Sequence, residues 1–168
     1  PEVFKGGAII AGLPYGSAKT VPEAFDRMRG HGGPPAGELQ RMLRAGSDHR
    51  GPWPSISIWQ GSADMTVAPS NAAAIASQWH AVHEREGTKP AYSKRDGNRT
   101  KQVWYDAAGQ KVMEINTIAG MGHGTPVGDG LGRPGPYMLD VGISSTREIA
   151  EFWAIAETSG KPAEARPM

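Results

Sequence analysis

The chain has 168 residues and a formal net charge of +1 with scattered Lys and Arg, so it offers no basic footprint for nucleic acid or a membrane surface. It has no cysteine, which excludes disulfides and thiolate chemistry, and no apolar run of about 18 residues to span a membrane. With 38% hydrophobic residues, 23 Gly and 14 Pro, the composition is that of one loop-rich globular domain.

The first third of the chain predicts one strand and two short helices. An apolar stretch closed by Gly and Pro turn chemistry predicts a short buried strand over residues 6–12. Thr20 and Glu23 are spaced as a capping box, and the helix that they begin should end at Gly30. A second helix is predicted where apolar residues share one face up to a glycine, at Leu39, Met42, Leu43 and Gly46.

The middle of the chain predicts a second strand and the clearest helix. The strand covers residues 54–60, with two isoleucines on one side. The helix is predicted over residues 69–86, because Pro69 suits a first turn and Gly87 suits a helix cap. Residues 88–100 are polar and are expected to be exposed.

The last part of the chain predicts a β-hairpin, a long loop and a closing helix. The hairpin strands cover residues 103–105 and 111–118, and residues 120–137 form a Gly/Pro-rich loop. Residues 145–148 (Ser-Thr-Arg-Glu) are spaced as a second capping box, and residues 158–168 are predicted to be a flexible tail. Strands that alternate with helices, with no linker between domains, predict an α/β layer fold.

Asp64 is the first candidate functional residue. Gly61 ends the preceding strand and allows a tight turn, so the carboxylate falls just beyond the strand's carboxyl end, where ligand sites of α/β sheets collect. A carboxylate there can accept a hydrogen bond from a histidine Nδ1–H and stabilise the imidazolium formed during proton transfer. The alternative is a loop aspartate that caps the helix beginning near Pro69.

His123 is the second candidate. Gly122 and Gly124 flank it after an apolar strand, so the loop can bring the imidazole to a nucleophile without side-chain clashes, and histidine is the natural general base near neutral pH. The alternative is a turn histidine in a flexible loop. Asp64 before His123 is the acid-then-base order of an α/β-hydrolase triad, but the 168 residues contain no Gly-x-Ser-x-Gly nucleophile elbow.

Other patterns carry less weight. His80 and His83 match neither zinc-protease motif, which favours a solvated helix face over a metal site. Residues 130–135 match a dinucleotide-binding fingerprint by letter, but they do not lie between a strand and a helix. Ser17 lacks the glycine two residues later that an elbow serine needs. The sequence therefore predicts neither a metal nor a cofactor.

Four segments of the chain together resemble the poly(3-hydroxybutyrate) depolymerase-like esterases. They are residues 3–16 (Val-Phe-Lys-Gly-Gly-Ala-Ile-Ile-Ala-Gly-Leu-Pro-Tyr-Gly), residues 61–64 with Val67, Pro69 and Asn71, residues 120–126 (Gly-Met-Gly-His-Gly-Thr-Pro), and residues 142–147 with Phe152 and Trp153. The resemblance covers about residues 1 to 156 and extends to feruloyl and acetylxylan esterases.

The resemblance implies an α/β-hydrolase fold with a mostly parallel sheet flanked by helices, of which residues 1–157 form the C-terminal half. It implies a secreted or periplasmic serine esterase that cleaves an ester substrate by acyl transfer, with Asp64 as triad acid and His123 as triad base. The family's nucleophile elbow and oxyanion hole precede residue 1. Tyr15 and Met121 flank strand ends on the expected active face and are candidate substrate contacts.

A non-catalytic binding or interaction module is the alternative from another functional class. Half a sheet would leave the strand at residues 6–12 with an unpaired edge, which invites pairing with another chain. That chain is either the enzyme's own N-terminal half or an unrelated partner. A metal-dependent hydrolase is a more distant alternative.

Overall fold

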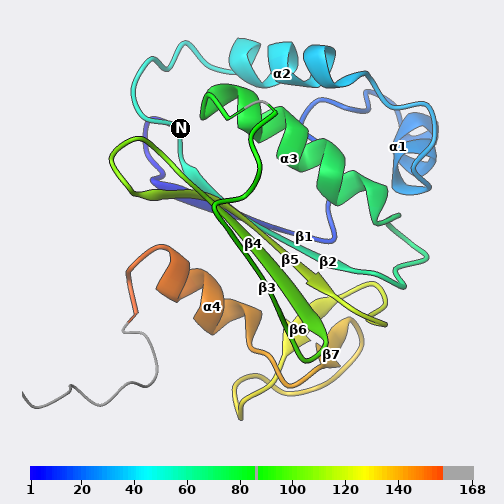
Figure 1. The fold of residues 1–168 in the computed structure, drawn as a ribbon. Coiled ribbons are helices and arrows are strands. Elements are labelled where there is room, and N and C mark those ends of the chain that lie inside the picture. The colour runs from blue at the N-terminus through cyan, green and yellow to red at the C-terminus, as the bar shows by residue number, and fades with distance from the viewer. Residues whose placement is uncertain (86, 157–168) are drawn as a thin grey trace, which may run out of the picture.

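A computed structural model describes residues 1–85 and 87–156; the predicted tail at residues 158–168 lies outside this range. The elements in chain order are β1 (Gly6–Ile10), α1 (Val21–Met28), α2 (Ala36–Ala45), β2 (Ser55–Gly61), α3 (Ser70–Val82), β3 (Tyr92–Asp96), β4 (Arg99–Tyr105), β5 (Lys111–Ile118), β6 (Thr125–Val127), β7 (Met138–Asp140) and α4 (Ser145–Phe152). The helices α1 to α3 lie on one face of the main sheet, and α4 lies on the other (Figure 1). The predicted α/β layer fold is therefore correct.

The main sheet is mixed rather than mostly parallel. Its strand order is β1-β2-β5-β4-β3. The strands β1, β2 and β5 run parallel, whereas β4 is antiparallel to β5 and β3 is antiparallel to β4. The short connections on both sides of β4 are the cause, because neighbouring strands joined by tight turns must reverse direction. The expectation of a mostly parallel sheet is corrected accordingly.

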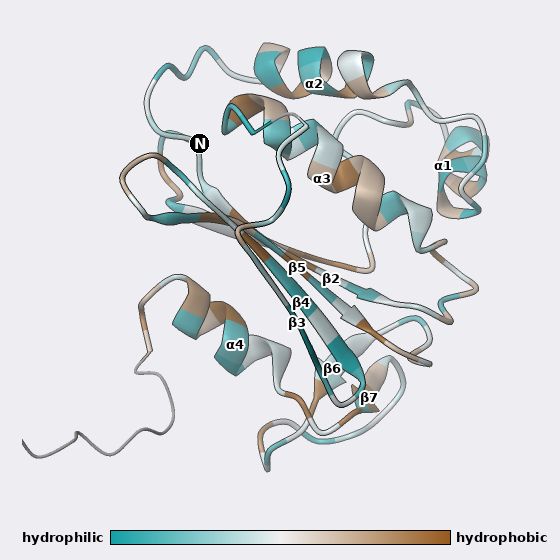
Figure 2. Cartoon of the chain, viewed as in Figure 1, coloured by the Kyte–Doolittle hydropathy of each residue, from teal (hydrophilic) through white to brown (hydrophobic). Residues whose placement is uncertain are grey.

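Both faces of β2 are buried: six of its seven residues are buried, and the polar Ser57 and Gln60 are among them. Ile56 and Ile58 pack in one core cluster with residues of α3, and Trp59 packs in a second cluster with Ile149 of α4. Figure 2 shows hydrophobic residues on α3 and α4, the two helices that face the sheet in these clusters. Successive side chains of a strand point to opposite faces of the sheet, so β2 contributes side chains to the hydrophobic clusters on both faces.

The first strand lies at the edge of the sheet. Within the described part of the chain, β1 pairs only with β2. Its residues are half-buried or exposed, so the expected buried strand is half-buried in fact. The reason is its edge position, since its second side has no strand beside it among these residues.

The helix boundaries follow local capping chemistry. The capping box at Thr20 and Glu23 is confirmed by both of its hydrogen bonds. The helix predicted over residues 69–86 ends at Val82, because Glu84 has a left-handed φ of 55° and the Arg85 N–H donates back to the His80 carbonyl. The helix α4 begins one residue earlier than the second capping box predicts: Ser144 is its N-cap, and the Ser144 hydroxyl accepts from the Arg147 N–H.

The remaining differences between the predicted and the observed elements are short strands. The hairpin of β4 and β5 is confirmed, but the exposed segment at residues 88–100 also contains β3, all of whose residues are exposed. Two residues, Gly97 and Asn98, separate β3 from β4, and this pair is a hairpin-turn signal. The strand β6 lies inside the loop predicted over residues 120–137, and β7 follows that loop directly; the two strands form a small parallel ladder. None of the described helices is long and apolar enough to cross a membrane.

Candidate active site

The register of β2 and β5 brings the two candidate loops together. Gly61 pairs with Ile118, so both strands end side by side, and their following loops leave from the same edge. The Ser62 N–H donates to the Ile118 carbonyl at 2.9 Å, and the Ala63 N–H donates to the Met121 carbonyl at 3.0 Å. The Ser62 hydroxyl also accepts from the Gly120 N–H. Backbone hydrogen bonds therefore fix the position of one loop against the other.

Asp64 and His123 meet between these loops. The Asp64 Oδ2 atom lies 2.9 Å from His123 Nδ1, while Oδ1 accepts from the backbone N–H groups of Thr66 and Val67. The Asp64 side chain is fully buried. The helix α3 instead has Pro69 at its N-cap, without a side-chain cap, so Asp64 is not a helix cap. The structure thus brings the two sequence candidates into direct contact.

The contacts of Asp64 favour its charged form. Burial raises the pKa of the carboxyl, but hydrogen bonds from the Val67 N–H, His123 and the Thr66 N–H outweigh burial, and the pKa lies below its usual 3.8. An ionised carboxylate only accepts hydrogen bonds, so the His123 Nδ1–H donates to it. This tautomer leaves Nε2 of the neutral ring as an acceptor. No group in the described part of the chain bonds Nε2, and the His123 side chain is 29% exposed.

Two residues that contact Asp64 or His123, Gln60 and Tyr137, were not predicted from the sequence. Gln60, buried at the end of β2, donates from Nε2 to Asp64 Oδ2 at 3.1 Å and to the Val67 carbonyl. A glutamine directly after the apolar Ile58 and Trp59 of a predicted strand was the available signal, because a buried amide needs partners. Tyr137 lies edge-on to the His123 ring, with ring centroids 6.0 Å apart. Its place in a Gly/Pro-rich segment gave no such signal.

The two candidate substrate contacts, Tyr15 and Met121, differ in burial and in the contacts of their backbones. Met121 is 4% exposed and packs in the core cluster with Trp59 and Ile149, so its backbone carbonyl, not its side chain, serves the site. Tyr15 is exposed, but its backbone is bound by the Gln78 amide of α3. Within the described residues, neither side chain has a recorded contact with Asp64 or His123.

The patterns set aside from the sequence form no second site. His83 stacks on Trp79, and His80 packs on Trp104, so these residues do not form the expected solvated face. Burial lowers the pKa of His83 to about 4. No helix follows the glycines at 130–135 before α4 begins at Ser145. Within residues 1–85 and 87–156, no group of three or more His, Cys, Asp or Glu side chains could hold a metal ion.

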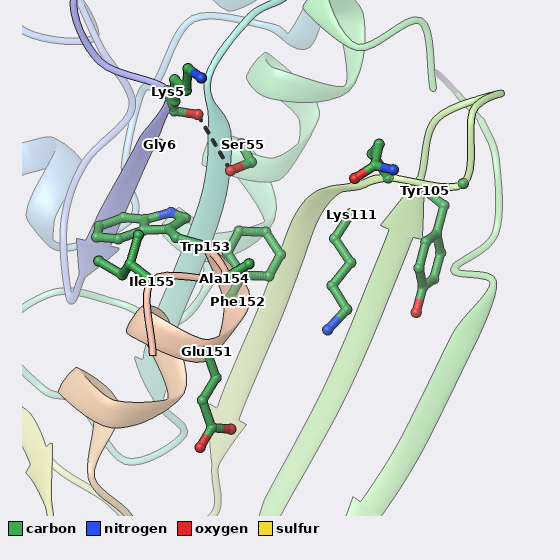
Figure 3. A pocket seen from close by; sticks show the side chains of 12 residues that line it. Lys5, Gly6, Ser55, Tyr105, Lys111, Glu151, Phe152, Trp153, Ala154 and Ile155 are labelled. Carbon is green, nitrogen blue, oxygen red and sulfur yellow. Dashed lines mark hydrogen bonds between the residues drawn. The ribbon is translucent and has the colours of Figure 1, made fainter. Parts of the chain in front are cut away.

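A separate cleft of about 520 Å³ lies at the opposite end of the strands. Its lining includes Ser55 and Lys111, the first residues of β2 and β5, together with Trp153 beyond α4 (Figure 3). Asp64 and His123 follow the carboxyl ends of the same two strands, and neither lines this cleft. The Asp64–His123 pair is therefore distinct from this cleft.

Replacing Gly61 with alanine should separate the two site loops. A Cβ atom at this position would overlap the Met121 carbonyl oxygen and approach the Gly122 carbonyl oxygen to 2.7 Å. Backbone cannot yield cheaply, so we expect a loss of about 1–3 kcal/mol in the free energy of unfolding, measured by urea denaturation. Gly37→Ala, in α2 with no atom within 4 Å of the added carbon, is the control and should gain about 0.5–1 kcal/mol. Equal stability of Gly61→Ala and the parent would contradict the close packing.

Comparisons with known proteins identify relatives of this chain. It is 41% identical over 163 residues to poly(3-hydroxyalkanoate) depolymerase C of Paucimonas lemoignei, and the match covers 92% of the chain and 39% of that protein. It is 31% identical over 132 residues to an acetylxylan esterase of Coprinopsis cinerea, covering 75% of the chain and 34% of that protein. No family model matches the sequence.

Two solved structures share the fold. An acetyl xylan esterase from Aspergillus awamori superposes with a TM-score of 0.70 at 18% identity, over 93% of this chain and 52% of that one. A PHB depolymerase complexed with an R3HB trimer superposes with a TM-score of 0.50 at 19% identity, over 82% of this chain and 39% of that one. The chain thus spans about a third to a half of the length of the proteins that it matches.

Proposed function

The chain is a partial-length relative of the poly(3-hydroxyalkanoate) depolymerase and acetylxylan esterase-like proteins, and from this premise we propose that it supplies the acid and base of a carboxylic-ester hydrolase. The observation that carries the proposal is the 2.9 Å contact between buried Asp64 and His123, with Nε2 of the imidazole unbonded by any described residue. A pair in this state can take up a proton from a nucleophile.

The proposed reaction is acyl transfer through a serine. His123 Nε2 removes the serine proton as the hydroxyl attacks the ester carbonyl, and the imidazolium then returns that proton to the leaving alkoxide. Asp64 holds the ring in the Nδ1–H tautomer and stabilises its positive charge. Water repeats the sequence on the acyl-enzyme and releases the acid. Backbone N–H donors hold the oxyanion in each step.

The serine and the oxyanion donors are proposed to come from polypeptide that precedes residue 1 in the complete enzyme. Two observations support this. The chain matches only 39% and 34% of the lengths of its two sequence relatives. In addition, no strand among residues 1–85 and 87–156 pairs with β1 on the side away from β2, where a further strand of an α/β-hydrolase sheet would pair. Residues 1–157 would then form the C-terminal part of one such domain.

A fluorophosphonate probe tests where the nucleophile resides. The probe reacts with activated serines, so the isolated 168-residue chain should remain unlabelled while the full-length enzyme is labelled once. Labelling of any serine within residues 1–168 would contradict this origin of the nucleophile. Absence of labelling in the full-length enzyme would contradict the serine mechanism itself.

A binding module that uses the free edge of β1 is the second candidate. The same edge that would receive the enzyme's own N-terminal half could receive an unrelated chain. The coding sequence upstream of Pro1 distinguishes the two: a Gly-x-Ser-x-Gly run about 10–30 residues before it supports the esterase, and stop codons there support the module. From the names of the relatives we propose a polyester or a short-chain ester as the substrate class. A secreted or periplasmic location and an aryl ester as an alternative substrate are proposed from the family resemblance of the sequence.

A further inference from the structure

Tyr137 is a large side chain left in solvent beside the acid–base pair. It is 69% exposed, and its ring meets the His123 ring at 75° with a centroid separation of 6.0 Å. Its hydroxyl has no hydrogen-bond partner among the described residues. An apolar ring and an unused polar group therefore lie next to the imidazole that the proposed reaction uses.

The backbone at Tyr137 has an uncommon conformation. Its φ of 60° is left-handed, and it occupies the third position of a turn in which the Met138 N–H donates to the Gly135 carbonyl at 3.0 Å. Gly or Asn normally fills this position in a turn with a left-handed third residue, because a side chain there is strained. The strain costs about 1–3 kcal/mol, and strained residues cluster at functional sites.

The turn is attached directly to the His123 loop. The Thr125 N–H donates to the Tyr137 carbonyl at 2.7 Å. A Cβ atom at Gly124 would lie 2.7 Å from the same carbonyl oxygen, so the glycine after His123 allows this close approach. The position of Tyr137 is thus fixed relative to the imidazole by backbone contacts and does not depend on its own side chain.

We infer that Tyr137 contacts the alcohol part of the ester and makes the site prefer a bulky alcohol portion; the inference rests on the proposed function. His123 must deliver its proton to the leaving alkoxide, so the alcohol part lies beside the imidazole during that step. The ring of Tyr137 borders the same imidazole. It offers apolar area to a ring or alkyl chain on the alcohol side, while a methyl ester would leave that area in water.

The test compares two acetate esters that differ only in their alcohol. In the full-length enzyme, kcat/KM is measured for benzyl acetate and for methyl acetate by acid release, with the parent, Tyr137→Gly and Tyr137→Phe. Loss of the ring in Tyr137→Gly should lower the benzyl-to-methyl ratio at least tenfold, chiefly through KM for the benzyl ester. Tyr137→Phe keeps the ring and should keep the ratio within about threefold.

The same variants separate a specificity role from a structural one. Glycine suits the left-handed φ, so Tyr137→Gly should fold with an unchanged or higher melting temperature. Tyr92→Ala removes an exposed ring on the distant edge strand β3 and should leave the ratio unchanged. An unaltered ratio in an active Tyr137→Gly enzyme would overturn the inference alone. A parent enzyme that hydrolyses neither ester would overturn the proposed function and the inference with it.

Discussion

In the full-length enzyme, His123→Ala is expected to lower kcat for ester hydrolysis by about 10⁴-fold or more, because the nucleophile loses its base and the leaving group loses its acid. The imidazole contributes little else to the fold, since its side chain is 29% exposed and its recorded hydrogen bond goes to Asp64. The melting temperature should therefore change by only a few degrees. Turnover of a chromogenic ester is the measurement.

Asp64→Asn and His31→Ala complete this experiment. The amide of the asparagine cannot hold the Nδ1–H tautomer or stabilise the imidazolium, so a loss of about 10⁴-fold is expected from Asp64→Asn as well. His31 is exposed, and its recorded hydrogen bonds use only its backbone, so His31→Ala should retain full activity. Activity of His123→Ala within tenfold of the parent would show that another group is the base.

Lys101→Ala is expected to cause the largest loss of stability. Glu114 has no exposed side-chain surface; its Oε1 accepts from the hydroxyl of Ser57, and its Oε2 lies 3.0 Å from Lys101 Nζ. Lys101 also pairs with Glu148 of α4 at 3.2 Å. Removing the ammonium leaves the Glu114 charge buried without its ion-pair partner, which costs about 3–5 kcal/mol in the free energy of unfolding.

The ionisation of Lys101 agrees with the direction of the effect. Burial lowers the pKa of Lys101, but attraction to Glu114 and then to Glu148 outweighs burial, so the pKa lies above its usual 10.5. Urea denaturation at neutral pH measures the loss. Lys94→Ala removes a pair between two exposed side chains and should cost less than about 1 kcal/mol. If Lys101→Ala costs no more than Lys94→Ala, the cluster does not stabilise the fold.

The sequence predicts correctly those elements that depend on interactions between residues close together in the chain. The capping box at Thr20, the hairpin of β4 and β5, and the strands that precede Asp64 and His123 all rest on neighbouring residues. The strand β3 was missed because an edge strand is held by backbone pairing and needs no apolar face. The early end of α3 was missed because a glutamate, not a glycine, adopts the left-handed cap.

Contacts between distant segments were beyond a reading of the sequence alone. The pairing of Gly61 with Ile118 makes the Asp64 and His123 loops neighbours, and no local pattern encodes that register. The approach of Tyr137 to His123 depends on the β6–β7 ladder, which joins strands of only three residues each. Met121 appeared to face the site by its position after a strand, whereas packing against α4 buries it.

Because β2 and β5 are adjacent, the Asp64–His123 contact forms within this chain and needs no other polypeptide. Both partners of the acid–base pair, their backbone donors and Gln60 come from residues 60–123. The imidazole is therefore oriented by this chain alone, before any nucleophile arrives. If the proposed division of the enzyme is right, a polypeptide carrying the serine could be added in trans, and recovery of activity would depend only on docking at the β1 edge. Under that proposal, one part of the enzyme orients the proton acceptor and the other part attacks the ester.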